Sequence, residues 1–266
     1  MNHFYDPVYD RGFSDIALGT WQKSKDWAQD SNNQNSLVYK VPATIASVLT
    51  AIEQGKISAI STKTDFTWQQ AIKLYATGQK EQAMFMLGHI LHLIEDASVP
   101  DHTRNDPHPN DSPYEMYTSQ FNLNNPDKNL GSNLKNKASI VLADLNSYFN
   151  ELADYSNNNF YSEDTIGIQS GYNSPQSDEI KKDGDYYYLI KQDDSGVNYL
   201  FVYKNYHNSI ILETKDNVSL KLADESRVVN SYWSRLSTKS IEYGAGVVNL
   251  FFQQANAAEN NQNTNE

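Results

Sequence analysis

Cysteine is absent from all 266 residues, so the chain has no disulfide and no thiolate ligand for a metal ion. Any metal site must therefore be built from histidine, aspartate and glutamate. Long apolar runs are absent as well, and none reaches the length of a transmembrane helix. No signal peptide precedes Met1, so the sequence as it stands shows neither a membrane span nor an export signal.

Positive charge is scarce. The chain has 21 Lys and Arg against 33 Asp and Glu, which gives a formal charge of −12. Such a surface repels phosphate backbones and anionic lipid at long range. Phosphate chemistry would need a local source of positive charge, which a bound metal cluster would supply. Hydrophobic residues make up 39% of the chain, enough to bury a core in one domain, with or without an insertion.

Most of the chain has the spacing and cap residues of helices. Helices are predicted from Pro42 to Gly55, from Trp68 to Gly78 with Thr67 as N-cap, over 81–97 up to the break at Pro100, over 114–121 with Ser112 as N-cap, over about 134–155, and from Ser226 to Ala255. Residues 185–222 are aromatic, β-branched and broken by turn signals, so three or four antiparallel strands are predicted there.

The predicted fold is mainly α, a helical bundle with a small antiparallel β insertion. The helical domain would comprise residues 1–160 and 223–256, and the β-rich insertion residues 161–222. Residues 257–266 are polar and are expected to form a disordered tail.

Four of the six histidines lie between Gly88 and Glu115, interleaved with acidic residues. His92 and Asp96 are four residues apart in the predicted helix, so an imidazole and a carboxylate on one face could reach one metal ion. His102 and His108 follow in the next turn and loop. This nitrogen and oxygen ligand set, without sulfur, suits zinc in a catalytic site.

A plainer interpretation exists for each of these residues. One histidine and one aspartate on a helix are usually ordinary helix residues, and His89 is expected to be a packing residue. Asp101, Asp106 and Asp111 offer further oxygens, but an acidic loop can also be a solvated turn. Only the density of residues at ligand-like spacing favours the metal site.

Two stretches resemble one family. His92-Leu-Ile-Glu-Asp96-Ala-Ser-Val-Pro100-Asp-His102 resembles the HxxxDxxxPxH core of the zinc-dependent phospholipases C, which share their fold with single-strand-specific zinc nucleases. Phe85-Met-Leu-Gly88 fits the family's pattern before that core, and His3-Phe4-Tyr5-Asp6-Pro7 resembles its HF[YW]DP loop. Tyr243–Phe252 is more weakly similar to the family's closing helix, and residues from about 160 to 225 have no counterpart.

The resemblance implies a phospholipase C-like helical bundle with two to three zinc ions. The implied ligands are His3, His92, Asp96, His102, His108 and Glu115. Asp96 would bridge two ions and take part in catalysis. Apart from the resemblance, Arg104 could hold a substrate phosphate, although an arginine beside acidic residues more often forms a structural ion pair. The family has HxxxE where this chain has Asp111 four residues before Glu115, so either His108 or Asp111 would complete that ion's ligands; His108 is favoured.

The family's ligands upstream of the HF[YW]DP loop have no counterpart, because the chain starts two residues before that loop. A truncated start is the favoured explanation, and a degenerate homologue is the other. With a truncated start, this chain would lack one zinc and would be weakly active or inactive; a degenerate homologue would have a reduced metal site.

The expected function is zinc-dependent hydrolysis of phosphodiesters by a metal-activated water, with phospholipids as substrate and transient contact with a membrane surface. A single-strand nuclease and a catalytically impaired metal-binding homologue are alternatives, and a plain helical domain with an accidental match is another. We expect a monomer with no stable nucleic-acid partner, secreted or periplasmic in its full-length form.

Overall fold

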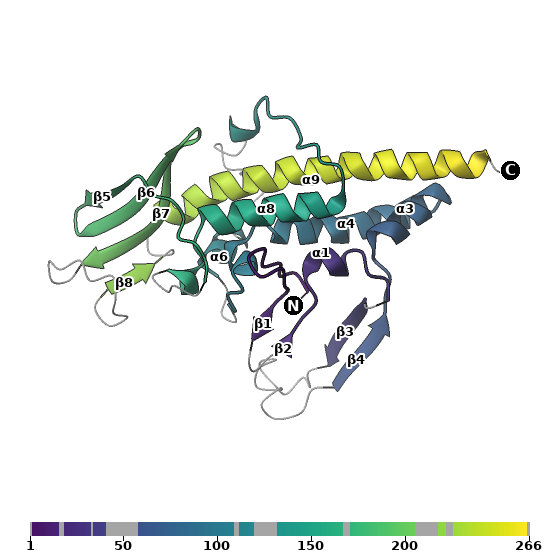
Figure 1. Cartoon of the computed structure of the whole chain (residues 1–266), viewed down its shortest axis with the longest axis horizontal. Coiled ribbons are helices and arrows are strands. Elements are labelled where there is room, and N and C mark those ends of the chain that lie inside the picture. Colours follow the sequence, from purple (N-terminus) through teal and green to yellow (C-terminus); the bar gives the residue numbers. More distant parts are fainter. Residues whose placement is uncertain are drawn as a thin grey trace.

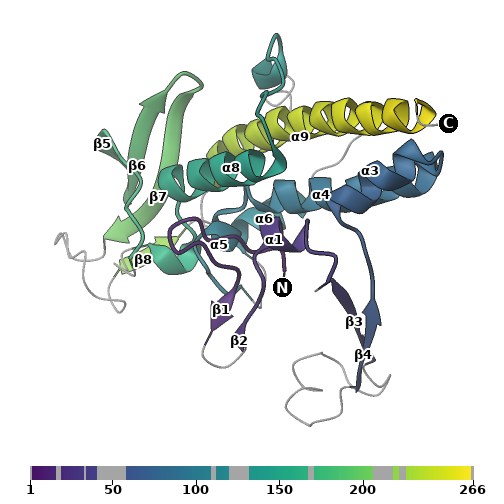
Figure 2. The same cartoon turned by 45° about the vertical axis from the view of Figure 1, so that its right-hand side comes forward.

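The computed structural model is built on helices that run side by side, with sheets at their margins (Figures 1 and 2). It describes residues 2–15, 19–32, 34–40, 58–108, 112–119, 132–166, 171–205, 218–221 and 226–264. The helices are α1 (Ser24–Trp27), α3 (Trp68–Ala76), α4 (Lys80–Asp96), α5 (Pro100–Thr103), α6 (Pro113–Ser119), α8 (Leu145–Asn159) and α9 (Ser226–Asn263). A short 3₁₀ helix, η1, spans Glu163–Thr165.

The fold is mixed, and the expectation of a mainly α bundle with a single β insertion is wrong. The described residues form three antiparallel sheets. Two are two-stranded sheets in the N-terminal part: β1 (Ser14–Asp15) with β2 (Gly19–Thr20), and β3 (Asn35–Lys40) with β4 (Ser58–Lys63). The third contains β5 (Glu179–Asp183), β6 (Tyr186–Asp193), β7 (Gly196–Asn205) and β8 (Val218–Lys221) in that order.

The two N-terminal sheets could not be predicted from the sequence, and the reason is physical. β1 and β2 have two residues each, too few to show alternation. β3 and β4 pair across a connection far longer than a hairpin turn, so no local turn signal joins them. The helix predicted from Pro42 to Gly55 lies outside the described residues.

The predicted helix starts at Thr67 and Ser112 are confirmed. Thr67 Oγ1 accepts a hydrogen bond from the backbone N–H of Gln70, and Ser112 Oγ accepts one from Glu115 N–H at 2.9 Å. The helix predicted over 134–155 begins later, at Leu145. Asp144 is its N-cap, because Asp144 Oδ1 accepts from Ser147 N–H at 2.9 Å. Residues 137–142 before it are not helical.

α9 is the longest helix and contacts most of the others. α3, α4 and α8 pack along it, and the four-stranded sheet lies at its N-terminal end (Figure 1). The tail expected to be disordered from residue 257 instead continues this helix to Asn263. The three or four strands predicted within 185–222 are confirmed as part of that sheet. Arg235 of α9 ties the sheet to the helix, donating to Asp193 Oδ2 at 2.5 Å and Oδ1 at 2.8 Å.

The main core lies between α4, α8 and α9. Leu87, Ile90 and Ile94 of α4 are buried there, facing Phe149 and Leu152 of α8. α4 is therefore buried along one side only, and its other side, which includes His92, is exposed.

Gly246 marks the closest approach to α9. A Cβ at this position would lie 2.6 Å from Tyr148 Cε1 and would also overlap the carbonyl oxygen of Ile140. Tyr148 holds that segment in place, donating to Ile140 O at 3.1 Å and accepting from Leu142 N–H at 3.0 Å. Only glycine lets residues 140–142 pass this close to the helix.

Substitution of two glycines in α9 should therefore have opposite effects. Gly246→Ala should lower the free energy of unfolding by about 1–3 kcal/mol, because the segment at Ile140 must move. Gly244→Ala should raise it by about 0.5–1 kcal/mol, because a Cβ there meets nothing closer than Leu91 Cδ2 at 3.9 Å. Urea unfolding of both variants measures this. Equal effects at the two positions would contradict the packing described here.

Candidate metal centre

The site is built where α4 ends and the chain turns back. α4 stops at Asp96, and Pro100 is the first residue of α5 rather than only the break expected after α4. Val99 has the extended conformation usual before proline. The turn returns His102 to the end of α4, where its side chain is only 2% exposed.

His102, His108 and Glu115 form a group that could hold a metal ion. His102 Nε2 lies 3.3 Å from Glu115 Oε1, and His108 Nε2 lies 3.0 Å from Glu115 Oε2. One ligand atom from each residue can be chosen so that all lie within 4.8 Å of one another, and this is the only such group among the described residues. The three come from α5, from the loop after it and from α6, whose capped start places Glu115.

Backbone carbonyls fix the orientation of both imidazoles. His102 Nδ1 lies 3.3 Å from the carbonyl oxygen of Asp96, and His108 Nδ1 lies 2.9 Å from that of Asp106. Because a carbonyl oxygen can only accept, these contacts require the proton on Nδ1. In a neutral imidazole with its proton on Nδ1, the Nε2 atom is unprotonated and carries a lone pair. Both Nε2 atoms face the Glu115 carboxylate. A proton on Nε2, or a bound cation, is needed for either nitrogen to be paired with the carboxylate.

The pKa shifts of His102, His108 and Glu115 show which of these residues binds a proton in the folded protein. Burial lowers the pKa of His102 below its usual value, and within the described part of the chain its Nε2 has no hydrogen-bond partner. The neighbouring imidazoles of His102 and His108 hold the pKa of Glu115 well below its usual range. Burial opposes charge on His108, but its contacts with Glu115 and the Asp106 carbonyl prevail and raise its pKa to about 9. In the metal-free group His108 is therefore protonated at Nε2 as well as at Nδ1, whereas His102 Nε2 has no hydrogen-bond partner among the described residues.

Three more of the expected ligands lie beside this group. Asp96 Oδ1 is 3.5 Å from His102 Nδ1, and Asp96 Oδ2 is 3.5 Å from His92 Nε2. The ring of His3 lies with its centroid 4.5 Å from that of His102. Asp96 Oδ2 is buried and, among the described residues, has no hydrogen-bond partner. The structure thus brings all six expected ligands into one region, although His3, His92 and Asp96 do not share the first group's close ligand spacing.

Two side chains beside the first group, Asp96 and His3, have pKa values far from their usual ones. Burial, followed by the nearby charge of Glu115, raises the pKa of Asp96 to about 8. Burial and the neighbouring His102 lower the pKa of His3 to about 2. A bound cation would stabilise the ionised form of the Asp96 carboxyl group, and the neutral imidazole of His3 could coordinate such a cation.

Other acidic residues named from the sequence have separate places. Asp106 Oδ2 accepts from Asp164 N–H at 3.0 Å and so anchors the loop that holds His108. Asp101 is buried, and burial together with Asp106 raises its pKa to about 7. Asp111, the alternative to His108, lies outside the described residues. His89 packs against Phe66, with ring centroids 4.7 Å apart and planes at 7°.

Arg104 does not have the role expected for it. Its side chain is buried, and its guanidinium donates to the carbonyl of Asn157 near the end of α8, to Thr165 Oγ1 at 3.1 Å and to the carbonyl of Asn173 at 2.8 Å. These bonds cap α8 and fasten two loops, so the guanidinium is not free to hold a substrate phosphate. The spacing from His102 suggested the substrate role, but spacing does not reveal burial.

Several supporting residues were not predicted from the sequence. Phe4, which is buried, packs against both imidazoles, its ring centroid 4.8 Å from His102 and 5.8 Å from His108. Tyr5 N–H donates to the carbonyl of His102 at 3.2 Å. Tyr172 OH donates to the buried Asp6 at 2.7 Å. The motif at residues 3–7 points to the first two, whereas Tyr172 is distant in sequence and carries no local signal.

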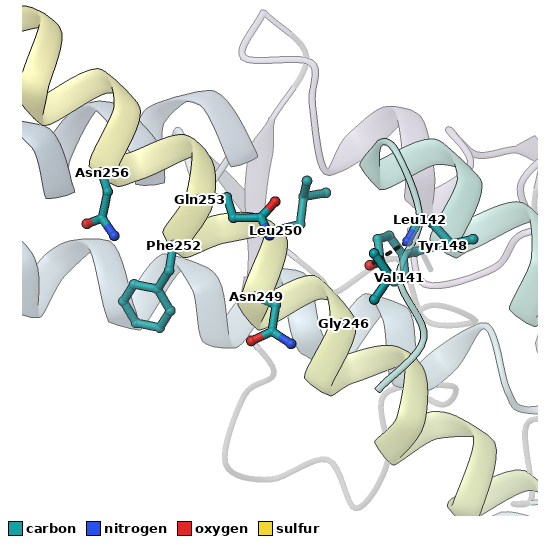
Figure 3. Close-up of a pocket in the computed structure, with 9 residues that line it drawn as sticks. All are labelled: Val141, Leu142, Tyr148, Gly246, Asn249, Leu250, Phe252, Gln253 and Asn256. Atoms are coloured by element: carbon teal, nitrogen blue, oxygen red, sulfur yellow. Dashed lines mark hydrogen bonds between the residues drawn. The ribbon is translucent and has the colours of Figure 1, made fainter. Parts of the chain in front are cut away.

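The pocket of about 310 Å³ between residues 141–142 and α9 is a separate feature (Figure 3). Its side chains are apolar, aromatic or amide, as with Leu250, Phe252 and Asn249, and none is charged. It offers no carboxylate or imidazole, so it does not compete with the metal centre as the candidate site.

Comparisons with protein-family models, curated proteins and solved structures find no match to this chain. No helix among the described residues has both the length and the apolar character needed to cross a membrane.

Substitution of Arg104 tests its structural role. Arg104→Met should lower the free energy of unfolding by about 2–4 kcal/mol, because buried carbonyls lose a charged donor. Arg227→Met is the control: this exposed arginine pairs with the exposed Asp183, and its loss should change stability by less than about 1 kcal/mol. Chemical unfolding measures both. An Arg104→Met variant as stable as the unaltered chain would contradict this structural role.

Asp96 should make the metal-free protein less stable as pH rises. Its pKa of about 8 lies above the usual 3.8, so the folded state keeps a proton that the unfolded state releases. The stability gained from this proton is present below about pH 4 and is lost as pH rises to about 8. Asp96→Asn should flatten this slope by up to about 1.4 kcal/mol per pH unit.

Unfolding with a chelator present, from pH 5 to pH 7, measures this slope. Asp194→Asn, at an exposed position, is the control and should leave the slope as it is. A slope that Asp96→Asn leaves unchanged would mean that Asp96 is ionised throughout this range in the folded protein.

Proposed function

We propose that this chain binds zinc through His102, His108 and Glu115 and hydrolyses phosphodiesters at that centre, with phospholipids as its substrates. One observation carries the proposal: two imidazoles whose Nδ1 atoms face backbone carbonyls both direct Nε2 at one carboxylate. Without a cation, His102 Nε2 has no hydrogen-bond partner among the described residues, and a bound cation would give it one.

The donor set fits zinc. Two ligands each about 2.1 Å from one tetrahedral zinc lie about 3.4 Å apart. The Nε2 atoms of His102 and His108 lie 3.3 and 3.0 Å from different oxygens of the Glu115 carboxylate, and one ligand atom from each of the three residues lies within 4.8 Å of the other two, close enough for a small side-chain movement to bring all three to one ion. Metal-bound histidines usually donate their other N–H to a carbonyl or carboxylate, as the Nδ1 contacts allow here. Two histidines and a carboxylate also bind iron(II) in some oxygenases, so iron is the ion to exclude by measurement.

The reaction class is supported by local motifs. Residues 3–7 and 92–102 resemble the zinc-dependent phospholipases C, and their histidines lie in one region of the structure. The mixed fold gives no further support to a phospholipase C-like reaction. Zinc, when bound, lowers the pKa of a coordinated water and neutralises charge on a phosphate.

The chain's own residues would divide the remaining work. His102, His108 and Glu115 hold the ion, and the carbonyls of Asp96 and Asp106 orient the imidazoles. The Asp96 carboxylate lies between His102 and His92, so it can serve a second ion that His92 and His3 would complete.

The substrate must bring its phosphate into an acidic protein. With a formal charge of −12, the chain repels polyanions, which favours a zwitterionic phospholipid at a membrane surface over a nucleic-acid strand. Secretion or periplasmic export and a monomeric state belong to the same proposal.

Elemental analysis of zinc and iron tests the metal assignment. The purified chain should contain at least one zinc per molecule, and His102→Ala and His108→Ala should each lose it. His89→Ala is the matched control, because His89 stacks on Phe66 one turn before His92 and should leave zinc content unchanged. Iron in place of zinc, or zinc retained in both ligand variants, would contradict the proposal.

Activity assays then decide the substrate. The zinc-loaded chain should release phosphorylated head group from phosphatidylcholine vesicles, with little action on single-stranded DNA. His108→Ala should reduce turnover by at least about 100-fold, as loss of a metal ligand does. Hydrolysis of DNA alone would replace the lipid by a nucleic-acid substrate. Bound zinc with no turnover of either would leave a metal-binding protein.

A further inference from the structure

Asn105 occupies the turn between the two histidine ligands His102 and His108. Its φ is +50°, in the left-handed region that non-glycine residues seldom adopt. Arg104 is the C-cap of α5, so Asn105 is the first residue beyond it. The backbone N–H of Asp106 donates to the carbonyl of Asp101 at 3.0 Å, which is the closing bond of a Schellman turn. This turn reverses the chain and brings His108 back beside His102.

The side chain of Asn105 makes a second, long-range connection. Its Oδ1 accepts from the backbone N–H of Ser14 at 2.7 Å, and its Nδ2 donates to the backbone carbonyl of Ser14 at 2.8 Å. The amide thus pairs with one residue of β1 much as a neighbouring strand would. Aspartate could not donate to the carbonyl, and glycine would make neither bond.

This pairing continues into the packing around the imidazoles. Phe13, next to Ser14, is buried and lies with its ring centroid 4.9 Å from that of Phe4. Phe4 in turn contacts the rings of His102 and His108. The neighbouring Tyr5 N–H donates to the His102 carbonyl. The segment from Phe4 to Ser14 is therefore fastened to the histidine-bearing turn at both of its ends.

We infer that Asn105 is a positioning residue that sets the affinity of the centre for its metal ion, by holding both the turn and the Phe13–Phe4 wall against the two imidazoles. The inference rests on the proposed function, because it takes His102 and His108 as ligands. Among the described residues, the side chain of Asn105 hydrogen-bonds to Ser14 and to no ligand atom of the centre. Its effect therefore passes through the orientation of the two imidazole rings.

Substitutions separate the turn from the pairing. Asn105→Gly keeps the left-handed turn at no steric cost but loses both bonds to Ser14. Asn105→Asp tolerates the same conformation and keeps one acceptor. Asn136 is the matched control, since it is the other asparagine with positive φ among the described residues, at +64°, and is exposed. Ser14→Ala should have no effect, because the pairing uses the Ser14 backbone.

The experiment is competition for zinc between each purified variant and a chromogenic chelator, together with thermal unfolding of the metal-free proteins. Asn105→Gly should weaken zinc binding about 10- to 100-fold, the range usual when a partner that orients a metal ligand is lost. Asn105→Asp should fall between Asn105→Gly and the unaltered chain. Asn136→Gly and Ser14→Ala should match the unaltered chain.

The outcomes separate this inference from the proposed function. If Asn105→Gly binds zinc as tightly as the unaltered chain, the inference is overturned while the metal centre stands. If Asn136→Gly weakens zinc binding as much as Asn105→Gly does, the effect is a general loss of stability and the inference fails. If the unaltered chain binds no zinc, both proposals fail.

Discussion

The imidazoles of His102 and His108 both face the carboxylate of Glu115. Much of the surrounding structure serves to hold the two rings in that position. Each ring is oriented by a backbone carbonyl at Nδ1, so its Nε2 is directed at Glu115. Burial lowers the pKa of His102, so its imidazole stays neutral and its Nε2 has no hydrogen-bond partner among the described residues, whereas His108 keeps its proton beside Glu115. A divalent cation would give His102 Nε2 a partner. In its absence the folded chain tolerates an unpaired nitrogen and, at Asp96, a carboxyl group whose pKa is far from its usual value.

The scaffold gives this centre rigid support from distant parts of the chain. α4 supplies Asp96 and His92 from a helix whose opposite face is fixed in the core against α8 and α9. The N-terminal segment adds Phe4 beneath the rings, while Arg104 anchors the same turn to the end of α8. Functional side chains thus extend from elements that are held by packing elsewhere, which is the usual condition for a precise metal site.

Several candidate ligands could be found in the sequence because their signals are local, whereas His3 was named only through the resemblance of residues 3–7. The spacing of His92 and Asp96 on one helix, the proline after it and the serine cap before Glu115 each act over a few residues. The same holds for α3, for the start of α6 and for the aromatic strands of the third sheet. Arg104 was misjudged because its partners lie 53 to 69 residues away, at Asn157, Thr165 and Asn173. Long-range pairing also hid β3 and β4, and the late start of α8 depends on the Asp144 cap within an otherwise helical pattern.

Anomalous diffraction at the zinc absorption edge, from crystals of the chain grown with zinc, tests the central claim most directly. A peak should lie about 2.1 Å from Nε2 of His102, Nε2 of His108 and one oxygen of Glu115, with both Nδ1 atoms still facing their backbone carbonyls. Zinc coordinated through Nδ1, or an anomalous peak away from this group, would contradict the account.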